Sequence, residues 1–249
     1  MFKSVHQAIE AILRSEPCSG RDEALIALGL RALLAAIGRL PDYRPHYIAK
    51  GGTVLRLLSK DPLERLSTDL DLSGVEFGPS PIDHYQFAAD IGREATQILR
   101  SIVSRGQADI SVRFNRTSDV AHRGEENPET EVYLVEVTAH LNGSNPTLAR
   151  GRGYKIDVTC DEYVDQELVT DLRTTSYHIP IDVRAYAPLQ SLAEKLRAIL
   201  QKHRHFTRTN NSSNLTPRHL FDLACKGRSK IRPKGGAKQG HLGGVAARA

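Results

Sequence analysis

Hydrophobic residues recur with the period of an α-helix in the first forty residues of the chain. A face of Phe2, Val5, Ile9, Ile12 and Leu13 predicts a helix over residues 2–14. The segment 21–38 is apolar around most of its circumference, which predicts a second, buried helix. Pro41 and Pro45 end this pattern, and YIAK (47–50) then has the composition of a short strand.

Alternating apolar and polar residues predict strands through the middle of the chain. The predicted strands are DLDLS (69–73), DISVRFN (109–115), EVYLVEVTAHL (131–141), YKIDVTC (154–160) and HIPIDV (178–183). The strand over 131–141 changes phase once between Leu134 and Val135, as a β-bulge would cause. A long helix is predicted between the first two strands, from Asp83 to about Ser104.

The helical period returns after Pro188. A stripe of Leu189, Leu192, Leu196, Ile199 and Leu200 predicts one helix, and Thr216-Pro217 is typical of the start of another. The sequence therefore predicts an α+β fold. We divide it into an α/β domain with a helical lead-in (1–185), a helical C-terminal part (186–226) and a basic tail that we expect to be disordered (227–249).

Charge is distributed unevenly along the 249 residues. The formal net charge is +5, but residues 227–249 contain six Lys or Arg and no acid, which leaves 28 basic and 29 acidic groups in residues 1–226. A basic, glycine-rich tail is typical of a disordered, solvated end, and it is equally compatible with an RNA-binding arm.

The remaining composition excludes several classes of protein. Three widely spaced cysteines without a CxxC pair argue against a disulfide framework or a zinc site. No apolar run has the length of a membrane span, and the first residues lack the layout of a signal peptide. We therefore expect a cytoplasmic protein with no membrane partner.

The segment DLDL contains the first candidate chemistry. Side chains at positions i and i+2 of a strand point to the same face, so Asp69 and Asp71 project together while Leu70 and Leu72 enter the core. Two neighbouring carboxylates repel each other unless a cation lies between them, and hard oxygen ligands suit Mg²⁺ or Mn²⁺. The alternative is an exposed strand whose polar face is merely acidic.

The surroundings favour the cation. Gly51 and Gly52 precede a helix, whose free backbone N–H groups can bind phosphate together with the Thr53 hydroxyl. Arg56 follows one turn later. In YKIDV the same alternation places Lys155 and Asp157 together on one face, so three carboxylates, a lysine and a glycine turn indicate a two-metal phosphoryl-transfer site.

Five short motifs follow one another along the chain: GGTVLR, RLSTDLDLS, YKIDV, LAEKLRAIL and RHLFDL. In order and spacing, from about residue 47 to residue 223, they resemble the AbiEii/AbiGii nucleotidyltransferase-like toxins, which include the mycobacterial MenT toxins. The resemblance implies a DNA-polymerase-β-like nucleotidyltransferase core with a helical C-terminal part. It also implies a toxin of a bacterial toxin–antitoxin or abortive-infection system, paired with a cognate antitoxin protein.

The resemblance further implies a reaction and the residues that perform it. The reaction is transfer of NMP from an NTP to an RNA 3′-hydroxyl with release of pyrophosphate, and tRNA is the known target in the MenT branch. The motif match assigns metal binding to Asp69, Asp71 and Asp157, phosphate contact to Gly51, Gly52, Thr53 and Arg56, nucleotide binding to Lys155 and Lys195, and the last motif to Arg218 and Asp222.

The residues themselves leave several alternatives open. Lys195 lies on the shoulder of an apolar stripe, where a lysine can simply extend its ammonium to water, and Arg218 and Asp222 can form an intrahelical ion pair. The family pattern RDLYDL reads RHLFDL here, with His219 replacing the first aspartate. A near-neutral body favours a small-molecule or protein hydroxyl as acceptor. A catalytically silent nucleotide-binding module is the other alternative.

Overall fold

A seven-stranded mixed sheet organises the residues that the structure describes. The structure is a computed structural model and describes residues 1–58, 69–75, 83–103, 110–116, 130–140, 147–159 and 164–209. The strands are β1 (Tyr47–Lys50), β2 (Asp69–Gly74), β3 (Ile110–Arg116), β4 (Thr130–Ala139), β5 (Thr147–Thr159), β6 (Val169–Ser176) and β7 (Ile179–Tyr186). The helices are α1 (Val5–Ser15), α2 (Arg21–Arg39), α3 (Gly51–Leu58), α4 (His84–Ile102) and α5 (Pro188–Thr209), and a short 3₁₀ helix, η1, spans Gln166–Leu168.

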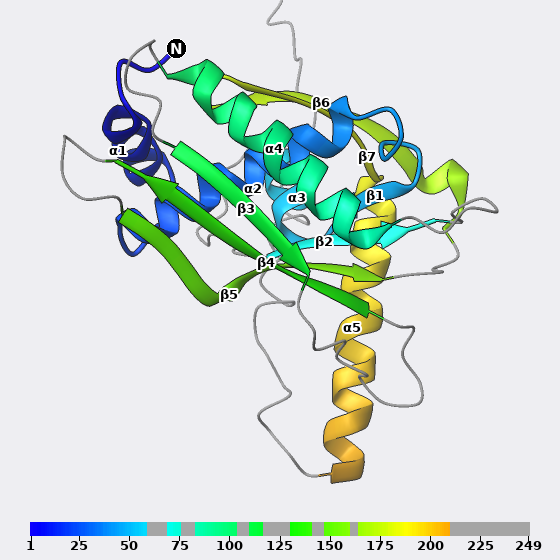
Figure 1. Cartoon of the computed structure of the whole chain (residues 1–249). Coiled ribbons are helices and arrows are strands. Elements are labelled where there is room, and N and C mark those ends of the chain that lie inside the picture. The colour runs from blue at the N-terminus through cyan, green and yellow to red at the C-terminus, as the bar shows by residue number, and fades with distance from the viewer. Residues whose placement is uncertain are drawn as a thin grey trace, which may run out of the picture. The chain divides into compact units, whose positions relative to one another are not determined.

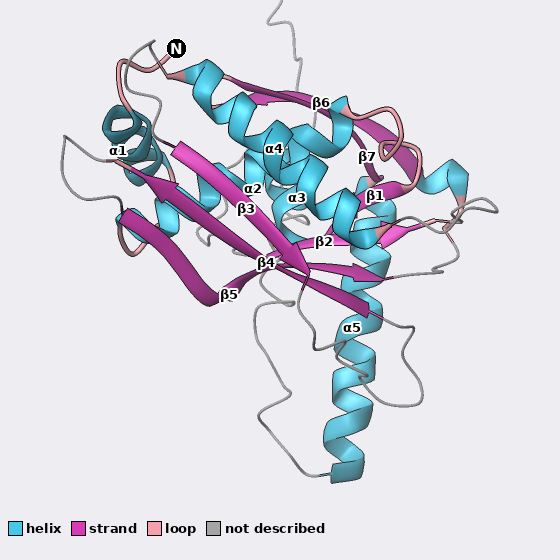
Figure 2. Ribbon diagram, viewed as in Figure 1, coloured by secondary structure: helices cyan, strands magenta, loops and turns pink. Residues whose placement is uncertain are grey.

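The order of the strands places the DLDL segment in the middle of the sheet. The order is β3-β4-β5-β2-β1-β7-β6. Strand β2 pairs in parallel with β5 and antiparallel with β1, and β1 pairs in parallel with β7 (Figure 2). Because β2 has a neighbour on each side, its polar side chains can meet groups from two other strands.

The core lies on the face of the sheet that α2 and α4 cover. Leu70 and Leu72 of β2 are fully buried there, as are Ile156 of β5 and Tyr133 of β4. Helix α2 is buried on nearly all sides, and its backbone approaches β7 so closely that a side chain at Gly38 would meet the carbonyl of Asp182. Burial of these apolar side chains is the main source of stability for such a layer.

Helix α4 protects an edge of the sheet. Its N-terminus is capped by Asp83, whose carboxylate accepts hydrogen bonds from the amides of Tyr85 and Gln86. Further along, the Thr96 hydroxyl accepts a hydrogen bond of 3.0 Å from the amide of Val112 in β3. Figure 1 shows α4 running beside β3. An edge amide that would otherwise be available to another strand is thus satisfied within the chain.

These elements confirm most of the predicted helices and strands. Both N-terminal helices, the Asp83 cap, the strand YIAK and the helix that starts at Pro188 are found. The predicted phase change within 131–141 is wrong, because Tyr133, Val135, Val137 and Ala139 alternate into the core without interruption. A register shift does occur between Leu134 and Glu136, but the extra residues lie on β5.

The boundary between two compact units of the chain lies near its C-terminal end. The chain divides into two units, Met1–Arg197 and Ala198–Ala249, with the boundary inside α5. The helix start at Thr216-Pro217 and the tail over 227–249 lie outside the described residues, so the division at residues 185 and 226 stays a prediction. Within the described part of the chain, no helix is both long and apolar enough to cross a membrane.

Candidate functional site

The aspartates of the DLDL segment meet a second acidic strand in the middle of the sheet. In the parallel pair of β2 and β5, Asp71 stands directly opposite Asp157, and Asp69 stands opposite Lys155. Leu70, Leu72, Ile156 and Val158 alternate with these residues and are buried in the core. Asp71, Lys155 and Asp157 therefore lie on the opposite face of the sheet, as the alternation in the sequence predicts, and Asp69 occupies a register position of that face.

An ion pair occupies part of this face. The Lys155 Nζ lies 3.0 Å from Oδ1 of Asp157, and both side chains are largely buried, with exposed fractions of 24% and 20%. That Oδ1 atom is inaccessible to water, and no described residue forms a hydrogen bond to it, so the Lys155 ammonium compensates its charge as an ion pair. A buried carboxylate oxygen with charge compensation but no hydrogen bond is suited to accept a cation.

The glycine turn lies directly against Asp71. Gly51, the first residue of α3, has a φ of +77°, a backbone conformation that residues other than glycine rarely adopt. A Cβ at this position would also collide with the Asp71 carboxylate. Thr53, two residues along the helix, is buried, with 5% of its surface exposed. The start of α3 and the acidic face are therefore parts of one site.

The structure adds a residue that the sequence reasoning missed. Lys50, the last residue of β1, pairs across the strands with Asp71. Its Nζ lies 3.4 Å from the Thr159 hydroxyl on β5 and 5.8 Å from the centre of the Tyr186 ring. The signal in the sequence was its position, because Lys50 is the polar end of the predicted strand YIAK and immediately precedes Gly51.

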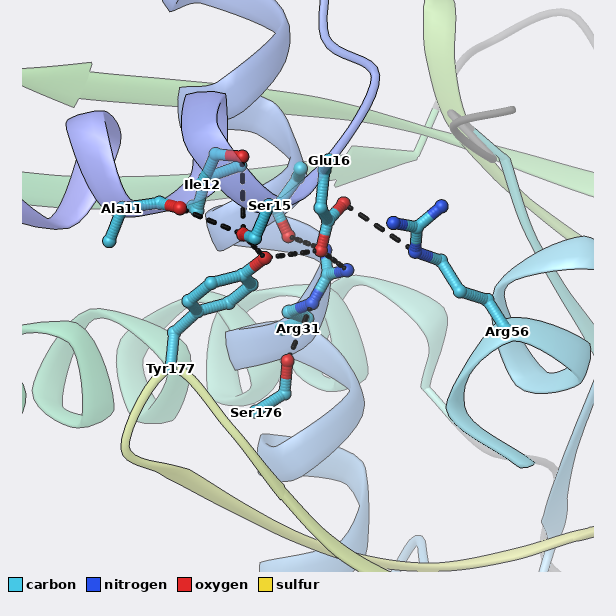
Figure 3. A network of polar contacts seen from close by, with 9 residues as sticks. Ala11, Ile12, Ser15, Glu16, Arg31, Arg56, Ser176 and Tyr177 are labelled. Atoms are coloured by element: carbon cyan, nitrogen blue, oxygen red, sulfur yellow. Dashed lines mark hydrogen bonds and ion pairs between the residues drawn. The ribbon is translucent and has the colours of Figure 1, made fainter. Parts of the chain in front are cut away.

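Arg56 belongs to α3, the helix that begins at the glycine turn, and its side chain contacts the end of α1. Its Nε is 3.7 Å from Oε2 of Glu16, the residue that caps the C-terminus of α1, and only 11% of the Arg56 side chain is exposed (Figure 3). The assigned contact of Arg56 with phosphate stays a prediction.

The remaining predicted residues are placed only in part. Lys195 is half-buried on α5. The backbone of Asp69 is described but its side chain is not, and Arg218 and Asp222 lie outside the described residues. Gly52 follows Gly51 in the first turn of α3. The structure thus brings together the glycine turn, Asp71, Lys155 and Asp157, and leaves the last motif untested.

The chemistry of the donors fits a hard divalent cation. Asp71 and Asp157 present carboxylates from directly paired positions, and one oxygen of Asp157 is buried without a hydrogen bond. Among the described side chains, to which that of Asp69 does not belong, no three His, Cys, Asp or Glu side chains are grouped as metal ligands. Asp69, two residues before Asp71 on β2, occupies the register position from which a third carboxylate could join them.

A comparison with protein families decides the identity of this arrangement. A model of the family described as nucleotidyl transferase AbiEii toxin, type IV toxin–antitoxin system, matches residues 32–234. The chain belongs to the AbiEii family. A search of curated proteins finds no match to the chain.

Membership of the AbiEii family agrees with the resemblance of the five motifs. The matched residues include β1, the glycine turn, both acidic strands and α5. The AbiEii family consists of nucleotidyltransferase toxins of type IV toxin–antitoxin systems, so the chain is an enzyme of the nucleotidyltransferase class and an antitoxin is its expected partner. Helix α1 and Glu16 lie before the matched residues.

Proposed function

We propose that this AbiEii-family protein transfers a nucleoside monophosphate from an NTP to the 3′-hydroxyl of an RNA, with tRNA as the expected acceptor. The observation that supports this most strongly is the direct pairing of Asp71 with Asp157 beside the Gly51 turn. Carboxylates next to a phosphate-binding helix start are the arrangement that phosphoryl transfer requires. We further propose a DNA-polymerase-β-like core and a cytoplasmic site of action.

The residues of the turn and its helix bind the triphosphate in this proposal. The backbone amides of Gly51 and Gly52 and the hydroxyl of Thr53 lie at the positive end of α3, where phosphate oxygens are stabilised. Arg56, Lys155 and Lys195 supply positive charge to the nucleotide. The Lys155 ammonium is already held at 3.0 Å from Asp157, so its charge stands at the acidic face before substrate binds.

Asp69, Asp71 and Asp157 would hold Mg²⁺ or Mn²⁺. When bound, such a cation lowers the pKa of an attacking hydroxyl and neutralises charge on the triphosphate. The carboxylates would hold the cation at one place on the sheet. Because Gly51 has no side chain, the Asp71 carboxylate can approach the turn without a steric clash. Their rigid strand positions fix the site before substrate arrives.

The proposed reaction exchanges one phosphorus–oxygen bond for another. The RNA 3′-oxygen forms a bond to the α-phosphorus of the NTP, and the bond from that phosphorus to the bridging oxygen of the β-phosphate breaks. Pyrophosphate leaves with the electron pair of the broken bond, and the hydroxyl proton is released to water. The products are RNA extended by one nucleotide and pyrophosphate.

Labelled nucleotides test the proposal. The protein is incubated with each α-³²P-labelled NTP, Mg²⁺ and total RNA, and the products are separated on a gel. Label in RNA that requires Mg²⁺ and that Asp71→Ala abolishes supports the proposal. Label in RNA that persists in Asp71→Ala, or no labelled product with any NTP, would refute it. Asp182→Ala, on the exposed face of β7, is the matched control and should retain activity.

The charge balance favours a second acceptor class. Residues 1–226 carry 28 basic and 29 acidic groups, whereas large RNA partners usually meet a basic surface. A protein or small-molecule hydroxyl would be modified by the same chemistry. In the same experiment, label that appears in protein or in a small product, and not in RNA, identifies this alternative.

A further inference from the structure

Glu16 lies at the centre of a buried polar network that joins four parts of the chain. Figure 3 shows the end of α1, helix α2, the turn between β6 and β7, and helix α3 meeting at this carboxylate. Their contributing side chains are Glu16 directly after α1, Arg31 from α2, Ser176 from the end of β6, Tyr177 from the turn, and Arg56 from α3. The Glu16 side chain is only 4% exposed.

One oxygen of Glu16 is held firmly. Its Oε1 accepts hydrogen bonds from the Arg31 guanidinium and, at 2.7 Å, from the Tyr177 hydroxyl. Arg31 is itself fixed, because its Nε donates to Ser176 at 2.9 Å and its Nη1 donates to the carbonyl of Ala27 at 2.9 Å. The carboxylate therefore has little freedom to move.

The turn that delivers the tyrosine is strained. Tyr177 and His178 have φ values of 51° and 63°, which are uncommon for residues other than glycine. The Tyr177 ring also lies under the Arg31 guanidinium, 5.3 Å from its central carbon. Backbone strain of this kind persists only where the surrounding contacts impose it. The network is thus rigid on the side away from α3.

The other oxygen of Glu16 faces α3. Its Oε2 is buried, has no hydrogen bond from a described residue, and lies 3.7 Å from the Nε of Arg56. Two guanidiniums with exposed fractions of 5% and 11% therefore share one carboxylate. Without the negative charge of Glu16 the two cations would repel each other in a site with little water.

Helix α3 is too short to fix its own position. It has eight residues, and isolated helices of that length are unstable in water. Its first residue, Gly51, lies against Asp71, while Arg56, about one and a half turns further on, faces Glu16. The contact with Glu16 thus restrains the helix that carries the glycine turn.

We propose that Glu16 is a positioning residue that holds α3, through Arg56, in the orientation that binds the nucleotide. This inference rests on the proposed function for the role of α3. Glu16 touches neither the acidic face nor the glycine turn, so its effect on nucleotide binding passes through Arg56. Loss of its charge should weaken NTP binding while the carboxylates that perform the chemistry stay in place.

Steady-state kinetics with NTP test the proposal. Glu16→Gln should raise KM for NTP by about tenfold, the factor expected for a lost charge-assisted contact, and change kcat much less. Arg56→Gln should raise KM at least as much, because it also removes the positive charge that Arg56 is proposed to supply to the nucleotide. The double variant should be no worse than the poorer single variant, because both changes break the same contact. Glu10→Gln on the exposed side of α1, where Glu10 pairs with Arg21, is the matched control and should leave KM unchanged.

The variant Tyr177→Phe distinguishes an effect on the position of α3 from an effect on the stability of the whole fold. It removes the hydrogen bond to the opposite oxygen of Glu16, so it should lower Tm and leave KM for NTP close to that of the unchanged protein. A KM that follows Tm across the five variants, or additive effects of Glu16→Gln and Arg56→Gln, would overturn the proposal. If Glu16→Gln does not fold, Glu16→Asp, which keeps the negative charge but withdraws it from Arg56, takes its place in the same comparison with Tyr177→Phe.

Hydrogen exchange distinguishes failure of this inference from failure of the proposed function. Without nucleotide, amides of residues 51–58 should exchange faster in Glu16→Gln than in Glu10→Gln. Faster exchange in a protein that transfers no nucleotide supports the restraint by Glu16 and refutes the proposed function. Unchanged exchange refutes the restraint, even where nucleotide transfer is observed.

Discussion

Asp71 has neighbours on three sides that limit what its carboxylate can contact. Asp157 stands opposite it on β5, Lys50 stands opposite it on β1, and the backbone of Gly51 lies against its oxygen atoms. Removal of a charge at this position therefore changes the interactions of two strands and one helix. Because the Asp71 carboxylate lies so close to the backbone of Gly51, the site depends on the glycine as well as on the aspartate.

Gly51→Ala should damage the site through the backbone. The new Cβ would meet the Asp71 carboxylate, and alanine disfavours a φ of +77°, so we expect a loss of about 1–3 kcal/mol in the free energy of unfolding and a large loss of transfer activity. Urea unfolding and the labelled-NTP assay measure the two effects. Gly92→Ala in α4 is the matched control, because its Cβ would meet nothing closer than 3.4 Å. A fully active Gly51→Ala would contradict this account.

Asp69→Ala and Asp71→Ala should each reduce transfer by at least roughly 10³-fold while the protein stays folded. Removal of one metal ligand removes several kcal/mol of transition-state stabilisation. Asp157→Asn should act in the same direction, with a smaller effect if Asp157 holds a single cation. Transfer rates and growth inhibition at equal expression provide the measurements, with circular dichroism to check folding. Toxicity retained by both alanine variants would exclude the metal-binding role.

Residue-level predictions from the sequence succeeded where the chemistry was local. The alternation in DLDL and YKIDV predicted which side chains share a face, because that depends only on strand geometry. The burial of Arg56 against Glu16 could not be predicted, because the two residues lie 40 positions apart and meet only in the folded chain. For the same reason the contact between Lys50 and Thr159 could not be predicted from the sequence.

At the scale of elements, strands could be predicted but their partners could not. Alternation predicted most of the strands, but it missed β6, an edge strand in which Leu172 is the one buried residue. The parallel pairing of β2 with β5 depends on contacts between distant segments, which alternation does not reveal. The bulge illustrates the limit. A change of apolar pattern near Leu134 pointed to the correct place on β4, but the extra residues belong to β5, whose pairing with β4 was unknown.

Thr96→Val should weaken the protected edge of β3. Valine has the same shape but cannot accept the hydrogen bond of 3.0 Å from the Val112 amide, so we expect a cost of about 1–3 kcal/mol. Thermal and urea unfolding measure the loss, and light scattering measures self-association through the edge. Thr207→Val is the matched control, since that exposed hydroxyl only bonds the carbonyl of Arg204 in its own helix. Equal stability of both variants would argue against a protective role.

The whole molecule should lose stability in alkaline solution. Burial, followed by Glu16 and Glu23, raises the pKa of the Cys18 thiol from 9.0 to about 11, and burial raises the pKa of Tyr177 from 10.0 to about 12. Both groups ionise earlier in the unfolded chain, so their stabilising effect is complete below pH 9 and is lost as the pH rises towards 12.

Melting temperatures measured between pH 8 and pH 12 test this expectation. Cys18→Ser combined with Tyr177→Phe should make the decline shallower without abolishing it, because burial also raises the pKa of Tyr43 to about 12. An identical slope in the double variant would show that these two groups do not control alkaline stability.

The basic tail allows a separate test on the complete molecule. Its composition predicts that removal of residues 227–249 leaves Tm nearly unchanged. If the acceptor is RNA, the truncated protein should bind RNA more weakly and with a flatter salt dependence, because fewer counterions are released. A small-molecule acceptor predicts unchanged activity. A large fall in Tm would show that the tail contributes to packing.

The parallel pairing of β2 with β5 has a consequence for protein synthesis. The glycine turn and β2 leave the ribosome early, but Asp157 follows Asp71 by 86 residues, and β1 gains its partner Ala185 on β7 later still. Domains acquire such long-range contacts only after the distant segment has been translated. An incomplete chain therefore lacks the paired carboxylates, so the proposed chemistry cannot begin while the ribosome that makes the protein is still translating its sheet.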